Sequence, residues 1–213
     1  MANAYGTPAY TERFRSLSAD TNGEHEILAL SSYRDYRAEG DCYSSFDGKY
    51  GYDSTLLSIY KGDRLIYRCL CNEERGYRLP CFYTENGEDF ALFRRDLYGY
   101  TILNLNTLAE YNYFPDKIFK GEEAFIICEA YPFRDILLLC GCYWAGPYHC
   151  RLLDAKTFRT YNLSEDMKNA DIEDDGLSIE GDEVIFTCSN GKRYGFLYGD
   201  LKRKLQESEN RDL

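Results

Sequence analysis

The sequence is poor in several residue types, and each scarcity excludes a class of protein. It holds two methionines, two histidines and one tryptophan among 213 residues. The 25 Lys and Arg residues are outnumbered by 36 Asp and Glu residues, which gives a formal net charge of -11. Binding to a nucleic-acid backbone depends on clustered Lys and Arg. Nucleic acid is therefore not expected as a partner.

Long apolar runs are absent as well. The longest, Ile136 to Trp144, is too short to span a bilayer, and no apolar run follows a basic region within residues 1–19. We therefore expect no membrane association and a cytoplasmic location.

The cysteine count of nine is odd, and most of these residues fall within apolar, strand-like runs. Without a secretory signal, they are expected to be reduced thiols.

Signatures of catalysis are missing too. The sequence has no phosphate-binding loop, nucleophile elbow, dinucleotide fingerprint or His-rich metal set. The neighbours His149 and Cys150 cannot form a catalytic dyad, because adjacent residues of a strand point to opposite faces. We expect no catalytic residue and no cofactor.

What the sequence does have is aromatic residues. Its 21 tyrosines and 12 phenylalanines are typical of pleated sheets, not of helical bundles. With 44% hydrophobic residues the chain can bury a sizeable core. We predict a single β domain over residues 1–213.

Two segments repeat each other at an offset of fifty residues: "YTILNLNTLAEYNY" (100–113) and "CRLLDAKTFRTYNL" (150–163). Each is predicted to form an outer hairpin. Asn104 or Asp154 can fold its side chain onto backbone N–H groups of the turn, while Thr107 or Thr157 helps to close it. The same offset places Cys140 on Phe90 and Cys150 on Tyr100, which indicates core positions.

Extending the repeat gives four units of about four strands, at residues 26–78, 79–120, 121–168 and 176–207. The first contains a strand at Glu26–Tyr33 followed by a polar insertion at Arg34–Asp53. Lys61-Gly62-Asp63 and Asn190-Gly191 are predicted hairpin turns. The last strand is placed at Leu201–Leu205, as a basic edge strand with a frayed tail, although Leu201 and Leu205 would share a face in a helix as well.

The segments "AFIICEAY" and "DILLLCGCYW" are apolar at consecutive positions, which indicates strands buried on both faces. Sheets stacked radially around an axis bury their early strands in this way. The units therefore resemble β-propeller blades of the WD-repeat type, although the Gly-His and Trp-Asp dipeptides of WD repeats are missing and no specific family is identified. We predict an all-β fold, a small β-propeller of about four four-stranded antiparallel blades, with Pro8–Arg15 closing the ring. Alternatives are a five-bladed or open propeller, or a β-sandwich.

Aromatic residues in predicted loops are the candidate binding residues. A hairpin tip between two strands of the third unit provides Trp144, Tyr148 and His149, although packing of Trp144 against a neighbouring blade is the favoured alternative. The insertion of the first unit provides Tyr43, Phe46, Tyr50 and Tyr52.

Two patterns imitate metal sites. Asp171, Glu173, Asp175 and Asp182 partly match a calcium loop, but an exposed acidic connector between blades is the favoured interpretation. Cys69-x-Cys71 and Cys140-x-Cys142 place thiols on one face of a strand, although zinc sites more often use Cys-x-x-Cys turns. We expect structural cysteines and no bound metal.

These observations favour a non-enzymatic interaction or scaffold module that binds a protein or peptide through loop aromatics. The alternative is a carbohydrate-binding or glycan-acting domain that uses carboxylates such as Asp41, Asp47 or Asp96. The sequence does not specify the oligomeric state.

Overall fold

The computed structural model describes residues 3–72, 80–144, 146–147, 149–154, 159–163 and 172–211, without the side chains of residues 172–177 and 208–211. Contacts within the chain divide it into two compact units, Met1–Ala124 (unit 1) and Phe125–Leu213 (unit 2). Each unit is described by itself. The single domain over residues 1–213 stays a prediction.

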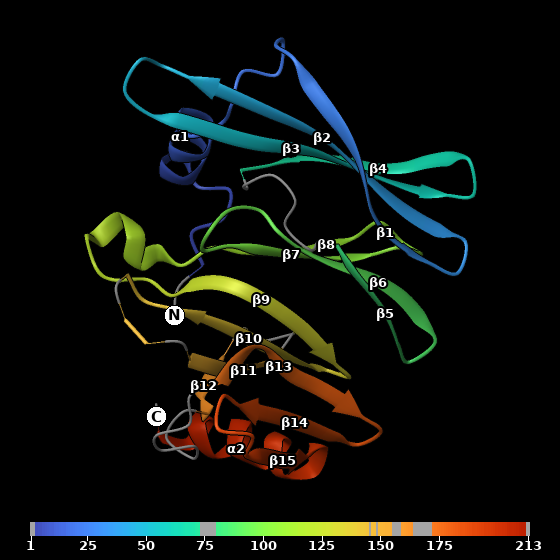
Figure 1. Ribbon diagram of the computed structural model, residues 1–213, viewed down its shortest axis with the longest axis vertical. Coiled ribbons are helices and arrows are strands. Elements are labelled where there is room, and N and C mark those ends of the chain that lie inside the picture. The colour runs from blue at the N-terminus through green and yellow to red at the C-terminus, as the bar shows by residue number, and fades with distance from the viewer. Residues whose placement is uncertain are drawn as a thin grey trace. The chain divides into compact units, whose positions relative to one another are not determined.

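Unit 1 contains a helix, α1 (Pro8–Ser16), and two antiparallel sheets in which strands that are consecutive in sequence lie side by side (Figure 1). The first sheet is formed by β1 (His25–Tyr33), β2 (Tyr36–Phe46), β3 (Gly51–Lys61) and β4 (Arg64–Cys71). The second is formed by β5 (Cys81–Glu85), β6 (Glu88–Arg94), β7 (Tyr100–Asn104) and β8 (Glu110–Tyr113), and the 3-10 helix η1 (Asp116–Lys120) follows it.

Unit 2 has the same plan with a different ending. Its first sheet is formed by β9 (Ile126–Phe133), β10 (Ile136–Cys142), β11 (His149–Asp154) and β12 (Thr160–Asn162). Its second sheet is formed by β13 (Ile172–Glu180), β14 (Glu183–Cys188) and β15 (Arg193–Leu197), and the helix α2 (Tyr198–Arg211) follows directly. The prediction of an all-β fold with about four antiparallel, blade-like sheets is confirmed.

The outer hairpins repeat as the sequence indicates. Leu103 pairs with Glu110 in β7–β8, and Leu153 pairs with Thr160 in β11–β12, so the offset of fifty holds on both strands. In the first hairpin, Asn104 Oδ1 accepts hydrogen bonds from the backbone N–H groups of Asn106 (2.9 Å) and Thr107 (3.0 Å). The predicted role of Asn104 in the turn is confirmed.

The fifty-residue offset is wrong for the strands that precede these hairpins. Asn104 pairs with Phe90, but Asp154 pairs with Ile136, so β6 and β10 are offset by 46 residues. The hairpin loop between β10 and β11 is longer than the loop between β6 and β7. Cys140 is therefore not the counterpart of Phe90, although it is buried in the core as predicted.

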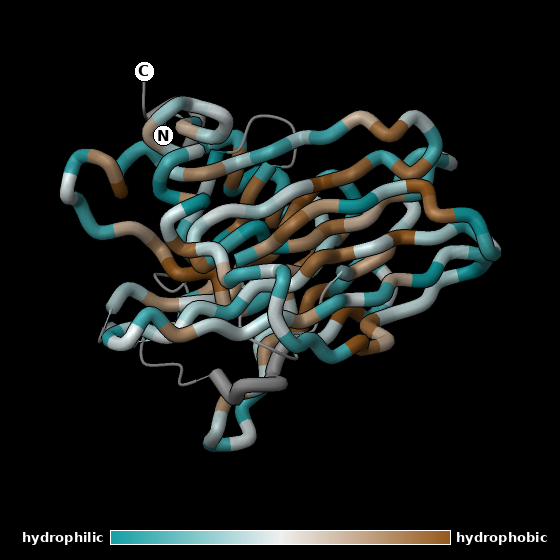
Figure 2. The backbone as a smooth tube through the Cα atoms, turned by 90° about the horizontal axis from the view of Figure 1, so that it is seen from above, coloured by the Kyte–Doolittle hydropathy of each residue, from teal (hydrophilic) through white to brown (hydrophobic). Residues whose placement is uncertain are grey.

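Each unit has its own apolar core, and hydrophobic residues are concentrated along the strands while the turns are hydrophilic (Figure 2). In unit 1 the core includes Tyr36, Ile59 and Phe93. In unit 2 it includes Leu138, Leu152 and Phe186. Burial of these side chains is the main stabilising contribution, about 1.5 to 3 kcal/mol for each fully buried one.

The predicted insertion at Arg34–Asp53 is wrong, because most of it is a hairpin of two eleven-residue strands, β2 and β3. Tyr36, Ala38, Gly40 and Cys42 are buried at alternate positions of β2. Small and polar residues at these positions conceal a strand pattern that burial makes plain. Asp47 to Tyr50 form the turn between the two strands.

The predicted closing strand at Pro8–Arg15 is also wrong, because this segment forms α1. Thr7 is the N-cap residue, and its Oγ1 accepts a hydrogen bond from the backbone N–H of Tyr10 at 3.3 Å. Pro8 occupies the first turn, where the missing N–H costs nothing. The helix packs through Tyr10 against Phe114, the residue that follows β8, with ring centroids 4.9 Å apart.

The predicted edge strand at Leu201–Leu205 is the third correction, because this segment belongs to α2. Leu201 and Leu205 are four residues apart and share one helical face, and both are buried in the core of unit 2. Lys202 fixes the helix to the β10–β11 sheet, since its Nζ lies 2.5 Å from Asp135 Oδ2 and 3.5 Å from Asp154 Oδ2. A helix thus takes the place expected for the last strand.

Candidate binding cleft beside the β2–β3 hairpin

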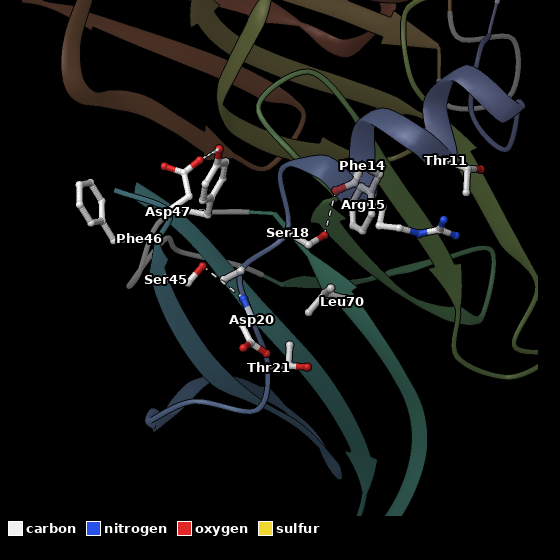
Figure 3. A pocket seen from close by; sticks show the side chains of 12 residues that line it. Thr11, Phe14, Arg15, Ser18, Asp20, Thr21, Ser45, Phe46, Asp47 and Leu70 are labelled. Atoms are coloured by element: carbon white, nitrogen blue, oxygen red, sulfur yellow. Dashed lines mark hydrogen bonds between the residues drawn. The ribbon is translucent and has the colours of Figure 1, made fainter. Parts of the chain in front are cut away.

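An open cleft of about 830 Å³ lies in unit 1 between α1 and the tip of the β2–β3 hairpin (Figure 3). Figure 3 shows Phe46 and Asp47 at one end of the cleft and Thr11 and Arg15 of α1 at the other, with Leu70 between them. The lining residues are Thr11, Phe14, Arg15, Ser18, Ala19, Asp20, Thr21, Ser45, Phe46, Asp47, Tyr52 and Leu70.

The segment that follows α1 forms one wall, and buried polar groups hold it in place. Ala19 N donates a hydrogen bond to Ser54 Oγ at 2.9 Å, and Asp20 N donates one to Ser45 Oγ at 3.3 Å. Asn72 Nδ2 donates to Phe14 O, the end of α1, at 2.7 Å. Ser54 and Asn72 are both buried, so the bonds that they form with Ala19 and Phe14 are shielded from competing water.

The opposite wall is the hairpin turn, which Asp47 organises. Its Oδ1 accepts hydrogen bonds from the backbone N–H groups of Lys49 (2.8 Å) and Tyr50 (2.7 Å), and its Oδ2 accepts one from the Tyr52 hydroxyl (2.8 Å). The backbone N–H groups of Tyr50 and Lys49, followed by the Tyr52 hydroxyl, lower the pKa of the Asp47 carboxyl. Residues of the turn and of the adjoining strand therefore stabilise it locally.

This rigid turn presents aromatic rings to solvent. Phe46, the last residue of β2, is 71% exposed, and Tyr50 is 54% exposed. An exposed, fixed aromatic ring beside an open cleft is typical of binding surfaces, because such a ring gains much contact area for little lost conformational entropy.

The four aromatic residues predicted to bind a partner from the supposed insertion lie in different environments in the structure. Phe46 and Tyr52 line the cleft, and Tyr50 lies in the adjoining turn. Tyr43 is a core residue of β2, 8% exposed, and its ring packs on that of His25 with centroids 5.2 Å apart. Phe14, Ala19 and Leu70 were missed, because only the fold brings these ordinary apolar residues to the hairpin.

The second predicted aromatic group lies in unit 2. Trp144 follows β10 and is 66% exposed, whereas Tyr148 lies outside the described residues. His149 is the first residue of β11 and is partly buried. Its Nδ1 is buried, and within the described part of the chain it has no hydrogen-bond partner.

The predicted acidic connector is wrong, because Glu173 and Asp175 belong to strand β13. Asp182 lies in the following turn and forms an ion pair with Arg134, and Asp171 lies outside the described residues. The expectation that this segment binds no calcium stays a prediction. Among the residues that the structure describes, no three His, Cys, Asp or Glu side chains are grouped so as to hold a metal ion.

Among the described helices, none is long and apolar enough to cross a membrane.

Comparison with known proteins identifies no family: neither a family model nor a curated protein matches the chain. Among solved structures, the crystal structure of HIRA(644-1017) aligns with a TM-score of 0.44 and 9% identity, over 82% of this chain and 50% of that chain. The computationally designed Ika4 protein aligns with a TM-score of 0.40 and 10% identity, over 85% of this chain and 96% of that chain. The chain therefore spans about half the length of the HIRA fragment that it matches.

Proposed function

We propose that this protein is a non-enzymatic interaction module that binds an extended segment of a partner protein in the cleft beside the β2–β3 hairpin. The observation that carries the proposal is the 71% exposure of Phe46 on a turn that Asp47 holds rigid. Leaving a large ring in water is unfavourable unless another molecule covers it. Binding would cover the ring against the apolar floor formed by Phe14, Ala19 and Leu70.

Charge indicates what kind of segment would bind. The cleft includes the carboxylates of Asp20 and Asp47 and one cation, Arg15, and the whole chain carries a formal net charge of -11. An acidic protein attracts basic partners and repels acidic ones. The expected ligand is a peptide segment with one aromatic or aliphatic anchor and flanking Lys or Arg residues.

The carbohydrate alternative has less support from the same residues. A glycosidase needs one carboxyl group with a raised pKa and a second close by. Hydrogen bonds lower the pKa of Asp47, and although burial raises the pKa of Asp96, that side chain has almost no exposed surface. Asp96 is 3% exposed and ion-paired with Arg13 at 3.1 Å, and Asp41 lies within β2 opposite Leu56. The carboxylates are engaged in the fold in ways that do not suit acid–base catalysis.

A display library of random peptides, selected on the full chain, tests the proposal. Peptides that are selected would be measured by fluorescence polarisation against the native protein and Phe46→Ser. Loss of a central aromatic contact is expected to weaken binding about tenfold or more. Tyr111→Ser is the matched control, because Tyr111 is 49% exposed in β8 and does not line the cleft.

Equal affinity of Phe46→Ser and the native protein would contradict the proposal. So would a glycan array on which the native protein binds sugars and Phe46→Ser does not, while no peptide is selected. That second result would favour the carbohydrate alternative.

A further inference from the structure

Two thiols lie together in unit 1, away from the aromatic residues of the cleft. Cys69 and Cys71 are two apart on β4, so both point to the same face of the strand, and their Sγ atoms are 3.9 Å apart. Cys71 is 4% exposed, whereas Cys69 is only partly buried. Cys69 is thus the less buried of the two thiols, although it packs against the core of unit 1.

A buried cation lies beside this pair. Arg95, which follows β6, is 8% exposed and reaches across to β4. Its Nη1 donates a hydrogen bond to the carbonyl oxygen of Leu70, the residue between the cysteines, at 3.2 Å. Its Nη2 donates to the Tyr67 hydroxyl at 3.1 Å. The guanidinium group is therefore held along the stretch of β4 that carries both thiols.

Further bonds fix Arg95 in this place. Its Nε donates to Thr101 Oγ1 at 3.0 Å, and its Nη2 lies 3.3 Å from Glu110 Oε2. Glu110 offsets part of the positive charge, but its side chain is 31% exposed and water weakens its effect. The Cys71 thiol and then the Arg95 charge lower the pKa of Cys69, against the opposing effects of burial and Glu110.

The surroundings decide which chemistry these thiols can perform. A metal cation would be repelled by Arg95, and the described part of the chain offers no third ligand grouped with the two sulfurs. A thiol that is not fully buried and lies beside a cation, by contrast, is the setting in which cysteine reacts as a thiolate. A second thiol within reach can then complete a disulfide.

We infer that Cys69 and Cys71 are a peroxide-reactive thiol pair, in which Cys69 is the attacking thiol and Cys71 the resolving thiol. The Cys69 thiolate attacks one oxygen of a hydroperoxide ROOH, so that an S–O bond forms and the O–O bond breaks. The departing RO⁻ takes up a proton and leaves as ROH. Cys69 is then a sulfenic acid.

In the second step Cys71 Sγ attacks the Cys69 sulfur. The S–S bond forms, the S–O bond breaks, and the hydroxide leaves as water with the proton of the Cys71 thiol. Two thiols are oxidised and one peroxide is reduced, and a small thiol such as glutathione can restore the pair by exchange.

Geometry makes the resulting disulfide easy to reduce. Residues two apart in an extended strand have Cα atoms about 6.6 Å apart, close to the upper limit of about 6.8 Å for a disulfide. The strand must therefore bend at its end to close the bond. Cys71 is the last residue of β4, where such a bend disturbs the fewest ladder hydrogen bonds.

The test uses the purified full chain, hydrogen peroxide as the oxidant, and peptide mapping by mass spectrometry. The peptide with both cysteines is expected to lose the mass of a hydrogen molecule and to resist alkylation until a reductant is added. Cys71→Ser should instead accumulate a sulfenic acid at Cys69, trapped by dimedone. Cys81 is the matched internal control, because it is also only partly buried but burial raises its pKa.

Arg95 is a positioning residue here, and its role is tested by a pH profile. Arg95→Gln should slow Cys69 oxidation about tenfold near neutral pH, and the deficit should close at higher pH where the thiol ionises unaided. Arg95→Lys should recover most of the rate. A deficit that is the same at every pH would show that the substitution only disturbs the structure.

Two results would overturn the inference. One is oxidation of Cys69 no faster than that of Cys81. The other is a Cys71→Ser protein that yields no dimedone adduct while the native chain forms no Cys69–Cys71 disulfide.

Discussion

The two units each contain a pair of close thiols, and they differ in a way that proximity alone would not predict. In unit 2, Cys140 and Cys150 pair across β10 and β11 with their thiols in direct contact, and in unit 1 Cys69 and Cys71 lie near each other on β4. Yet Cys140 and Cys150 are 1% and 0% exposed in an apolar core. The hydrogen bond with Cys150, and then burial, raise the pKa of Cys140 well above its ordinary value.

Carboxyl groups also differ between the units, but here the raised pKa is in unit 1 and the lowered pKa is in unit 2. In unit 1, burial raises the pKa of Asp96 even though Arg13 is its ion-pair partner. In unit 2, the Lys202 ammonium group and the Tyr198 hydroxyl lower the pKa of the less buried Asp135. For thiols and carboxylates alike, the direction of the pKa shift depends on the balance between desolvation and the nature of the neighbouring groups.

The largest expected difference between the units is in thiol reactivity. With iodoacetamide and native protein, Cys69 should be alkylated about a hundredfold faster than Cys140 or Cys150, because their reaction requires local opening of the core. Timed quenching followed by peptide mapping measures all three rates in one sample. Similar alkylation rates at Cys69 and Cys140 would contradict the expected difference in thiol reactivity between the two units.

Serine substitution should also distinguish the two thiol pairs, through its effect on the free energy of unfolding. Cys150→Ser places a hydroxyl group in an apolar core and should lower the free energy of unfolding by about 2 kcal/mol. Cys69→Ser, at a partly exposed site beside polar groups, should cost less than about 1 kcal/mol. Hydrogen exchange of the β11 and β4 amides locates each effect in its own unit, and a larger loss for Cys69→Ser would reverse the expectation.

The smallest effect concerns the ion pair that fixes α2. Lys202→Met should cost about 1 kcal/mol near neutral pH, since the pair is partly exposed. The folded pKa of Asp135 is lowered, so its contribution is present above the ordinary Asp value of about 3.9 and is lost as the pH falls through the folded value. Urea unfolding of both proteins should therefore differ at neutral pH and converge in acid.

Asp96 provides the opposite trend as a control. Its folded pKa is raised, so its contribution is complete below the ordinary Asp value and is lost as the pH rises through the folded value. The native protein should therefore gain stability relative to Asp96→Asn on acidification. The same trend for Asp96→Asn and Lys202→Met would contradict the difference between the two sites.

The strands with a clear apolar pattern and the turns with a local mechanism could be predicted from sequence. Gly62 and Gly191 have φ values of 56° and 78°, in the left-handed region that hairpin turns require. Asn104 acts within its own turn, so a short stretch of sequence contains all that is needed.

Elements that depend on context could not be predicted in this way. Leu201 and Leu205 share a face in a helix and in a strand alike, and only the core of unit 2 selects the helix. The β2 strand was hidden because Gly40 and Asp41 have low strand propensity, which burial and pairing override. For α1, the cap residue Thr7 and Pro8 were local signals that went unused.

The candidate cleft shows a similar division. Phe46 and Tyr52 stand out in the sequence as aromatic residues beside turn residues, but α1 and Leu70 reach them only in the folded chain. The reactive thiol pair follows the same rule. Spacing places Cys69 and Cys71 on one face, whereas Arg95 arrives from another sheet.

Leu70 belongs both to the proposed peptide-binding cleft and to the strand segment that carries the proposed thiol pair. Its side chain is part of the floor of the cleft, and its backbone joins the two thiols. A bend of β4 that closes a Cys69–Cys71 disulfide must shift this floor. A peptide bound in the cleft would therefore oppose oxidation of the two thiols. By thermodynamic reciprocity, the oxidised protein would release that peptide by the same factor, which would make the cleft a sensor of peroxide.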